Sequence, residues 1–263
     1  MNQDILNEMT VLNNELVNTQ RLLMKQNTEI NRLNKQLQFI NADLVQFTYV
    51  VSHDLKEPLR MVTSFMELLK SRHGYALDEK AKVYINFAVD GGRRMQKMID
   101  DLLELSRIGR ENSVKEFTDI NAIVKEVKEN ILKLTEETGA EIIIKTELPF
   151  LSVYRSDIVR LMQNLISNAI KFRKKDIPPV IYVNAKEEKD GWLFSIEDNG
   201  IGIEKEKFEK IFEIFTRLHA RESYEGSGIG LAVCKKVVQH HGGTIWVESE
   251  EGIGSTFYFK LLK

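Results

Sequence analysis

The sequence predicts a protein in two parts, an all-α N-terminal half followed by an α+β domain. The first fifty residues contain no Gly or Pro, and their apolar residues recur at alternating steps of four and three, which is typical of a coiled coil. A second helical pattern follows a short break, which predicts a helical hairpin. From residue 117 onward, helical patterns alternate with strand patterns and turns, which indicates helices packed on a sheet.

The coiled coil is expected over residues 1–44, as a parallel homodimer. The heptad pattern continues for about seven repeats, and the flanking positions are polar. A single amphipathic helix packed on a large core is the alternative, but its apolar stripe would be wider. The seam, whose weakest positions are Thr19 and Gln26, consists of Ile5, Met9, Leu12, Leu16, Thr19, Leu23, Gln26, Ile30, Leu33, Leu37, Ile40, Leu44, Phe47 and Val51.

Residues 45–108 are expected to form the hairpin, which becomes an antiparallel four-helix bundle when two copies dimerise. Three successive steps of four after Phe47 interrupt the heptads, and Pro58 lies in this stretch, so we expect a mechanically soft joint. A break at residues 73–77 precedes Asp78, a plausible N-cap of the second helix. The stripe expected on that second helix is Tyr84, Ala88, Gly91, Met95, Met98, Leu102 and Leu105. A linker is expected at residues 109–116.

The α+β domain is expected over residues 117–263, with helices on one face of its sheet. Its strands are recognised by short apolar runs between turn residues, and its helices by their amphipathic spacing. The expected elements are a helix from Asp119 to about Thr138, a strand at 141–146, a helix at 156–172, strands at 180–185 and 192–197, a helix at 228–241, and strands at 244–249 and 256–261.

Composition excludes several classes of protein. The formal net charge is -2 and the sequence pI is about 6.3, so no basic surface for nucleic acid or an anionic membrane is expected. The single cysteine, Cys234, excludes a disulfide framework and a multi-cysteine zinc site. No run approaches the roughly 20 apolar residues of a membrane span. We therefore expect a cytoplasmic protein without a membrane span, whose sensory domain lies outside this sequence.

Three groups of residues in the second half suggest nucleotide chemistry. Asn164, Asn168 and Lys171 fall on one face of the expected helix. Two neutral carbonyl oxygens and one cation suit a magnesium triphosphate, because Mg²⁺ takes oxygen ligands and keeps phosphates and waters in its shell. A solvated helix face is the alternative for this group taken alone.

The second group is Asp198 with Gly200 and Gly202, directly after an expected strand. A carboxylate at a strand end accepts a hydrogen bond from an adenine amino group, and the glycines allow the backbone to approach a ligand. An ordinary turn would have the same residues.

The third group is Gly226, Gly228, Gly230 and Leu231, which open a helix. Free backbone N–H groups at a helix N-terminus favour phosphate. The group does not follow a strand, so it does not fit a dinucleotide fingerprint, and no P-loop lysine is present. Between the second and third groups, about two dozen residues predict a lid, in which Arg217 or Arg221 would neutralise phosphate.

In this order, the groups and an upstream histidine segment resemble sensor histidine kinases over residues 45–263. The lid is similar to that of the phytochrome-like branch. The resemblance rests on SHDLKEPL at 52–59 (H box), NLISNAIKF at 164–172 (N box), DNGIG at 198–202 (G1 box), residues 208–215 (F box), GSGIGL at 226–231 (G2 box) and GIGSTF at 252–257 (closing glycine motif).

This resemblance implies a dimerisation and phosphoacceptor hairpin followed by an α/β sandwich of the Bergerat or GHKL type. His53 would be the phosphoacceptor, assisted by Asp54 as general base and orienting group. ATP and Mg²⁺ would be the cofactors, and the aspartate of a response regulator receiver domain would take the phosphoryl group. The implied nucleotide ligands are Asn164, Asn168 (which would also hold Mg²⁺), Lys171, Phe172, Asp198, Gly200, Gly202, Arg217, Gly226, Gly228, Gly230, Leu231 and Thr256.

Local features agree with that role for His53. In the heptad frame it falls off the seam, so we expect an exposed ring that both ATP and a partner protein can reach. Asn164 stands where related ATPases carry a water-activating Glu, so hydrolysis is disfavoured. Glu57 replaces the Thr or Asn common in the family, which makes phosphatase activity doubtful. The rival interpretations are a pseudokinase scaffold and a GHKL-type ATPase.

Overall fold

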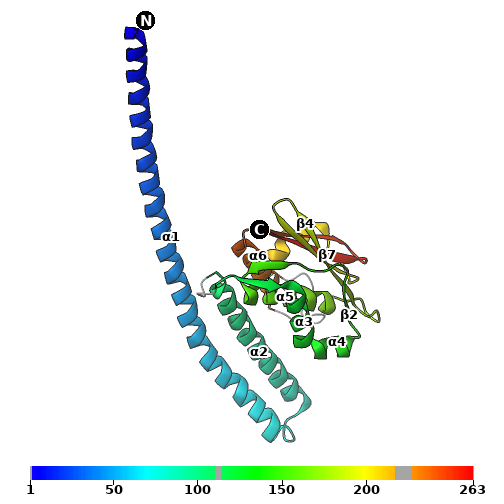
Figure 1. The fold of residues 1–263 in the computed structure, drawn as a ribbon. Helices are drawn as coiled ribbons and strands as arrows, with labels where there is room; N and C mark the ends of the chain where they lie inside the picture. The colour runs from blue at the N-terminus through cyan, green and yellow to red at the C-terminus, as the bar shows by residue number, and fades with distance from the viewer. Residues whose placement is uncertain (1, 110–113, 217–226, 263) are drawn as a thin grey trace. The chain divides into compact units, whose positions relative to one another are not determined.

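The computed structural model of the chain describes residues 2–109, 114–216 and 227–262 (Figure 1). The chain forms two compact units, Met1–Val51 and Ser52–Lys263. Predicted site residues Arg217 and Gly226, and the lid residues between them, lie outside the described part of the chain.

The first unit is a single helix, the N-terminal part of α1 (Asn2–His73). The predicted helix is therefore confirmed. Its described seam residues, including Leu12, Leu16 and Leu23, are exposed in the single chain. Such a regular row of exposed apolar side chains is the pattern of one strand of a coiled coil.

The second unit begins with the hairpin. Helix α1 continues without interruption through Pro58, and α2 spans Glu79–Arg107. Asp78 caps α2 as predicted, because its Oδ1 accepts a hydrogen bond from the backbone N–H of Ala81 at 2.6 Å. The predicted break between the two helices is confirmed.

The face that α2 turns to α1 differs from the predicted stripe. Ile85, Val89 and Gly92 are the buried residues of the helix in this region, and a side chain at Gly92 would clash with the Thr63 hydroxyl. Tyr84 and Met95 of the predicted stripe are 67% and 51% exposed. Within one chain, the face of α2 that packs on α1 is therefore shifted by one residue toward the C-terminus from the predicted stripe. The prediction missed this shift because the apolar periodicity does not distinguish contact within a hairpin from contact between hairpins.

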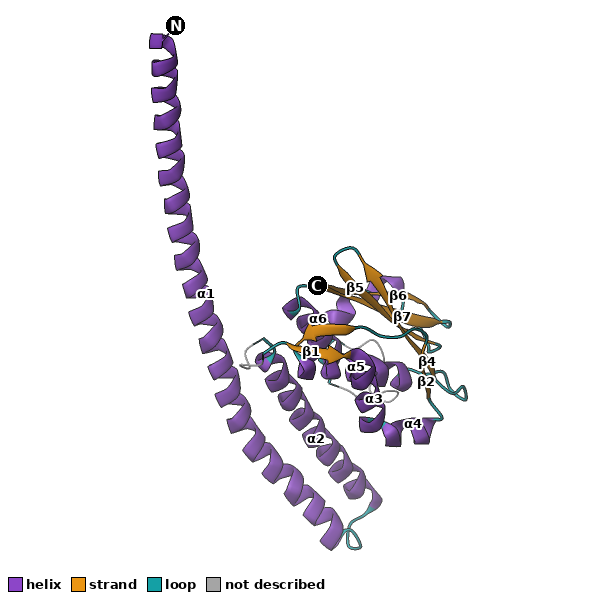
Figure 2. Cartoon of the chain, viewed as in Figure 1, coloured by secondary structure: helices purple, strands orange, loops and turns teal. Residues whose placement is uncertain are grey.

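The rest of the second unit is an α+β domain with a five-stranded sheet in the order β2-β4-β5-β7-β6. Neighbouring strands are antiparallel except β2 and β4, which are parallel. Helices α3, α5 and α6 cover one face of the sheet (Figure 2). The elements are α3 (Ile120–Asn130), α5 (Arg155–Lys171), α6 (Gly230–His240), β2 (Glu141–Ile144), β4 (Val180–Glu188), β5 (Gly191–Asp198), β6 (Thr244–Glu250) and β7 (Gly254–Leu262).

The core lies between these helices and the sheet. Alternate residues of β4, such as Ile181 and Val183, are fully buried, as expected for a strand with one covered face. Leu161 and Leu165 of α5 meet them from the helical layer. This arrangement fixes α5 against the sheet and so positions the polar side of α5.

Two features differ from expectation. The helix expected to run from Asp119 to Thr138 is two helices, α3 and α4 (Leu132–Thr138), separated at Ile131. Strands β1 (Glu116–Asp119) and β3 (Phe150–Val153) form a two-stranded antiparallel sheet that was not predicted. Each has four residues, which is too short for a two-residue alternation to stand out. Two short 3₁₀ helices, Lys205–Lys207 and Lys210–Phe212, follow β5.

Candidate nucleotide and phosphoacceptor site

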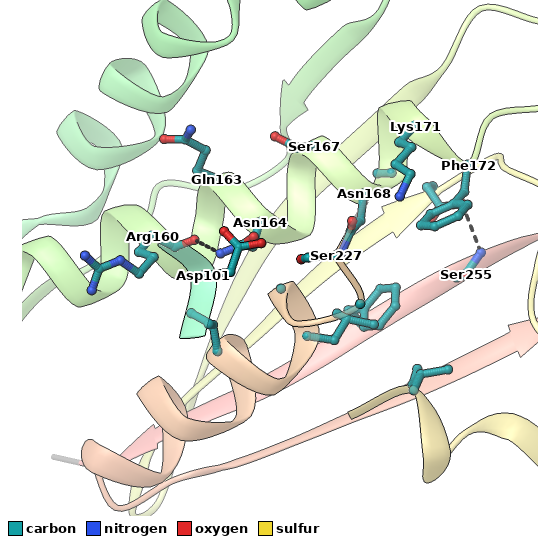
Figure 3. Close-up of a pocket in the computed structure, with 18 of the residues that line it drawn as sticks. Asp101, Arg160, Gln163, Asn164, Ser167, Asn168, Lys171, Phe172, Ser227 and Ser255 are labelled. Atoms are coloured by element: carbon teal, nitrogen blue, oxygen red, sulfur yellow. Dashed lines mark hydrogen bonds between the residues drawn. The ribbon is translucent and has the colours of Figure 1, made fainter. Parts of the chain in front are cut away.

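A cavity of about 670 Å³ lies beside α5 and the start of α6 (Figure 3). It has a suitable size for a nucleotide, since small-ligand pockets are typically about 300–1,000 Å³. The structure brings most of the predicted nucleotide residues to its wall. Those that line it are Asn164, Asn168, Lys171, Phe172, Asp198, Gly202, Gly228, Gly230 and Leu231.

Helix α5 supplies the amide side of the cavity. The Asn164 Nδ2 donates to the backbone carbonyl of Arg160 at 3.1 Å, which fixes the orientation of the amide. A Cβ on Gly230 would lie 2.9 Å from the Asn164 Oδ1, so the first turn of α6 approaches this oxygen closely. Asn168 lies one turn further along α5. Together they present neutral oxygen ligands of the kind that Mg²⁺ accepts.

Asp198 lies at the end of β5. Its Oδ1 accepts hydrogen bonds from the backbone N–H groups of Gly200 at 2.8 Å and Ser255 at 3.2 Å. Burial raises the pKa of Asp198 to about 6, although the two N–H donors oppose the rise. Above that pH the group is a partly buried carboxylate whose Oδ1 is held by two backbone donors, and such an acceptor suits an amino-group donor on a ring.

Two glycines let the chain adopt the shape of the wall. Gly202 has φ +73° and a side chain there would clash with the Glu250 carbonyl. Gly228 has φ +77°, and a Cβ there would lie 2.9 Å from the Thr216 carbonyl. Both conformations are strained for residues with a side chain, so these positions are restricted to glycine.

Two predicted residues do not line the cavity. Gly200 is not part of the wall, but its N–H donates a hydrogen bond to Asp198, which is. Thr256 lies on β7 between Ser255 and Phe257, which do line the cavity, and alternation along the strand directs it to the other face of the sheet.

The prediction missed several residues of the wall. Arg160, Gln163 and Ser167 lie on the same face of α5 as the predicted amides, and their spacing of three and four was a signal that could have found them. Asp101 and Glu104 come from α2, more than fifty residues earlier in the chain. No sequence spacing indicates such a long-range approach.

His53 lies on α1 with a side chain that is 67% exposed, as the off-seam position predicted. Its Nδ1 lies 3.2 Å from the Asp54 Oδ1. When Nδ1 carries the proton and donates to this carboxylate, the Nε2 lone pair points away from Asp54 and is available as a nucleophile.

Asp157, His240 and His241 form the one group among the described residues with the spacing of a metal site. The His241 Nδ1 lies 2.8 Å from the Val237 carbonyl, and its Nε2 accepts from the Tyr154 backbone N–H at 3.1 Å. Burial lowers the pKa of His241. With both nitrogens engaged in a neutral ring, this group is a hydrogen-bonded network that joins the ends of α5 and α6.

The fold and the site together combine a helical hairpin that exposes a histidine with an α/β domain that holds a nucleotide-sized cavity. Comparison with known families gives two matches. Residues 43–111 match the family model described as the His Kinase A (phospho-acceptor) domain. Residues 154–263 match the family described as Histidine kinase-, DNA gyrase B-, and HSP90-like ATPase. The chain belongs to the sensor histidine kinase family.

Similar proteins include phytochromes. The chain is 43% identical to the phytochrome-like protein Cph1 of Synechocystis sp. over 240 residues, which is 91% of this chain and 32% of the relative. It is 42% identical to cyanobacterial phytochrome A of Nostoc sp., over 91% of this chain and 31% of the relative. The chain thus spans about a third of the length of these relatives.

Solved structures share the fold. Full-length ShkA in complex with AMPPNP matches with a TM-score of 0.61 and 24% identity, over 82% of this chain and 45% of that one. The histidine kinase AdeS of Acinetobacter baumannii matches with a TM-score of 0.54 and 20% identity, over 80% of this chain and 97% of that one. Within the described residues, no helix has the length and apolar character to cross a membrane.

Proposed function

We propose that this chain is the kinase portion of a two-component sensor, which transfers the terminal phosphoryl group of ATP to His53 and then to an aspartate of a receiver domain. The observation that carries the proposal is the combination of an exposed His53–Asp54 pair with a nucleotide-sized cavity lined by Asn164, Asn168 and Asp198. The similarity to phytochrome-like kinases supports it.

In the proposed reaction, the His53 Nε2 lone pair forms the new bond to the terminal phosphorus. The bond from that phosphorus to its bridging oxygen breaks, and ADP leaves with the electron pair. Asp54 holds the Nδ1 proton, stabilises the positive charge that develops on the ring, accepts this proton from the phosphorylated ring, and returns it to Nδ1 during the transfer to the receiver. The carboxylate of the receiver then attacks the phosphohistidine, and the ring leaves as neutral imidazole.

The cavity supplies the positioning. Asn168 would hold Mg²⁺, which neutralises phosphate charge when bound. Asn164 and Lys171 would contact the phosphates, with the backbone N–H groups around Gly228 and Gly230 at the start of α6. Asp198 would accept from the adenine amino group, beside the Phe172 ring. The described lining fits such a ligand, because its oxygen ligands, its cation and its glycine backbone converge on one cavity.

Asn164 also favours a kinase over an ATPase. An amide has no basic lone pair with which to take a proton from water. The phosphoryl group is therefore expected to remain until His53 reaches it, and steady phosphate release is expected to be slow.

The proposed assembly is a parallel homodimer in the cytoplasm that responds to a sensory domain outside this sequence. The support is the row of large apolar side chains that the single chain leaves exposed along both helices of the hairpin. These include Leu55, Val62, Phe65, Leu69, Tyr84, Phe87 and Met95.

Incubation with Mg²⁺ and ATP labelled at the terminal phosphate tests the proposal. We expect an acid-labile, alkali-stable phosphoprotein that is lost in His53→Ala and in Asn168→Ala. His73→Ala is the matched control, because His73 is an exposed histidine on the same helix. Labelling that survives in His53→Ala contradicts the proposal.

A further inference from the structure

The end of α2 is fastened to the α+β domain by three contacts, which we call the α2 latch and define by Glu104, Leu105 and Ile108. Glu104 forms an ion pair with Arg160 of α5. The Leu105 carbonyl accepts a hydrogen bond from the Lys236 Nζ of α6 at 2.7 Å. The Leu105 and Ile108 side chains are 8% and 4% exposed and belong to the core of the domain.

Local chemistry explains why α2 ends there. The last carbonyls of a helix lack partners within it, and a cation near the C-terminus also meets the negative end of the helix dipole. The Lys236 ammonium group supplies both a hydrogen bond to the Leu105 carbonyl and a positive charge near the helix C-terminus. The chain then turns at Gly109, which has φ +82° and packs beside the His240 ring. Within the α2 latch, the C-terminus of α2 is therefore capped by Lys236, a residue from another part of the same unit.

The same residues form one wall of the nucleotide cavity. Asp101, Glu104 and Arg160 all line it. Arg160 lies one helical turn before Asn164, yet its guanidinium extends away from Asn164 in Figure 3. Its Nη1 also lies 3.7 Å from the Asp157 carboxylate. Arg160 is thus held by the carboxylates of Glu104 and Asp157, while one further acidic group of α2, Asp101, borders the space.

We propose that Arg160 serves two anions in turn, Glu104 while the α2 latch is closed and the terminal phosphates of a bound nucleotide once it is open. This inference rests on the proposed function. A triphosphate carries several negative charges, so Asp101 and Glu104 oppose its entry. Guanidinium pairs strongly with phosphate through parallel hydrogen bonds, and the long arginine stem allows the change of partner.

A thermodynamic consequence follows from this competition. If triphosphate binding opens the α2 latch, then opening the latch strengthens triphosphate binding by the same factor. A nucleoside without phosphates does not compete for Arg160, so its affinity is independent of the latch. The coupling opens the α2 latch when ATP occupies the cavity. It closes the α2 latch when no phosphates are bound.

Hydrogen exchange in the full chain tests the opening directly. The amides of residues 104–109 are followed without ligand, with Mg²⁺ and AMPPNP, and with adenosine. We expect AMPPNP to speed their exchange and adenosine to leave it unchanged. Unchanged or slower exchange with saturating AMPPNP would overturn the inference. If AMPPNP does not bind at all, the proposed nucleotide site itself fails, which is a separate result.

Titration calorimetry of variants tests the reciprocal effect. Glu104→Gln keeps the shape of the side chain and removes its charge, and we expect its Kd for AMPPNP to fall about fivefold with no change for adenosine. Glu79→Gln, an exposed carboxylate in the first turn of α2, is the matched control and should not change the Kd. Arg160→Gln should weaken AMPPNP binding and leave adenosine unaffected. Weaker AMPPNP binding by Glu104→Gln would mean that this wall helps hold the nucleotide, and would refute the competition.

A second variant guards against an effect of misfolding. Lys236 caps the Leu105 carbonyl but does not line the cavity. Lys236→Met should therefore raise amide hydrogen exchange at residues 104–109 in the absence of ligand. Lys235→Met, at the neighbouring exposed position, is its control. Equal exchange in both variants and the wild type would show that the Lys236 contact does not hold the α2 latch.

Discussion

The helix that carries the exposed histidine and the helix that carries the amides of the cavity differ in how they are held. On α1, His53 is exposed, and its described hydrogen-bond partner is the adjacent residue, Asp54. On α5, the amides of Asn164 and Asn168 stand on a helix whose other face is buried in the core. A phosphoacceptor must be reached by both a nucleotide and a second protein, whereas a nucleotide site requires fixed geometry. The His53 ring is therefore free to be approached, whereas the core holds the backbone of α5 in place on the amide side of the cavity.

This difference predicts opposite outcomes for substitutions on the two helices. A substitution on the exposed turn of α1 should abolish phosphoprotein formation and leave the fold intact. A change on the buried face of α5 should weaken the fold and impair chemistry only as a consequence.

The largest effect is expected for His53→Ala. Phosphoprotein formation should disappear, while the free energy of unfolding should stay within about 0.5 kcal/mol of the wild type, as for other exposed sites. Urea unfolding and phosphate labelling of the same sample measure both. A loss of several kcal/mol would show that the ring has a packing role that its exposure does not suggest.

The second effect concerns Leu165, which is fully buried on α5 between the two amides. Leu165→Ala should lower the free energy of unfolding by about 2–5 kcal/mol, through lost transfer energy and a residual cavity. Leu132→Ala, at a position 55% exposed, is the control and should cost little. Similar midpoints for the two variants would contradict the assignment of α5 as the core helix of the site.

The third prediction uses the pKa of Asp198, which burial raises to about 6. Because the folded pKa lies above the unfolded value, protonation favours the folded ligand-free protein, and this stabilisation is lost as pH rises from about 4 through 6, by at most about 3 kcal/mol. Adenosine affinity should change in the opposite direction and fall below pH 6, where the acceptor is neutralised. Calorimetry at pH 5 and 8, together with urea unfolding, measures both trends.

Asp198→Asn separates the two effects. It should remove most of this pH dependence and gain stability at pH 8, while it loses adenosine binding. Glu136→Gln, at an exposed position of α4, serves as the control. A pH profile that persists unchanged in Asp198→Asn would assign the titration to another group.

The smallest effect is expected at Thr256, which alternation places on the face of β7 away from the cavity. Thr256→Ala should change the Kd for AMPPNP by less than about twofold, or under roughly 0.4 kcal/mol. The same substitution at Ser255, which lines the cavity, gives the comparison. A larger effect at Thr256 than at Ser255 would reverse the assigned faces of the strand.

Much of the site was predictable from the sequence because it is built from short segments. Asn164, Asn168 and Lys171 share one helix face, and Asp198 follows a strand, so local periodicity placed them correctly relative to their own elements. The motif order then joined these elements into one cavity. The helix on each side of the break at residues 73–77 was predictable for the same reason.

The features that were not predicted depend on contacts between distant segments. Asp101 and Glu104 reach the cavity from α2, and Ile85 and Val89, not Tyr84, face α1. Heptad spacing identifies apolar positions but not the helices that they contact. In a four-helix bundle each helix has two neighbours, so the spacing alone does not say which neighbour an apolar residue faces. The four-residue strands β1 and β3 are stabilised by pairing with each other, which a local pattern does not contain.

Pro58 has a consequence for the neighbourhood of His53. Proline has no N–H to donate, and in an α-helix the N–H of residue 58 would otherwise bind the carbonyl of residue 54. The main-chain bond that the helix gives up is therefore the one at Asp54, the partner of the phosphoacceptor. Bending or twisting the helix costs least at that carbonyl, where water can take the place of the missing donor. A torque applied along α1 would accordingly produce its greatest local displacement within one turn of His53, the side chain on which the proposed phosphoramidate would form.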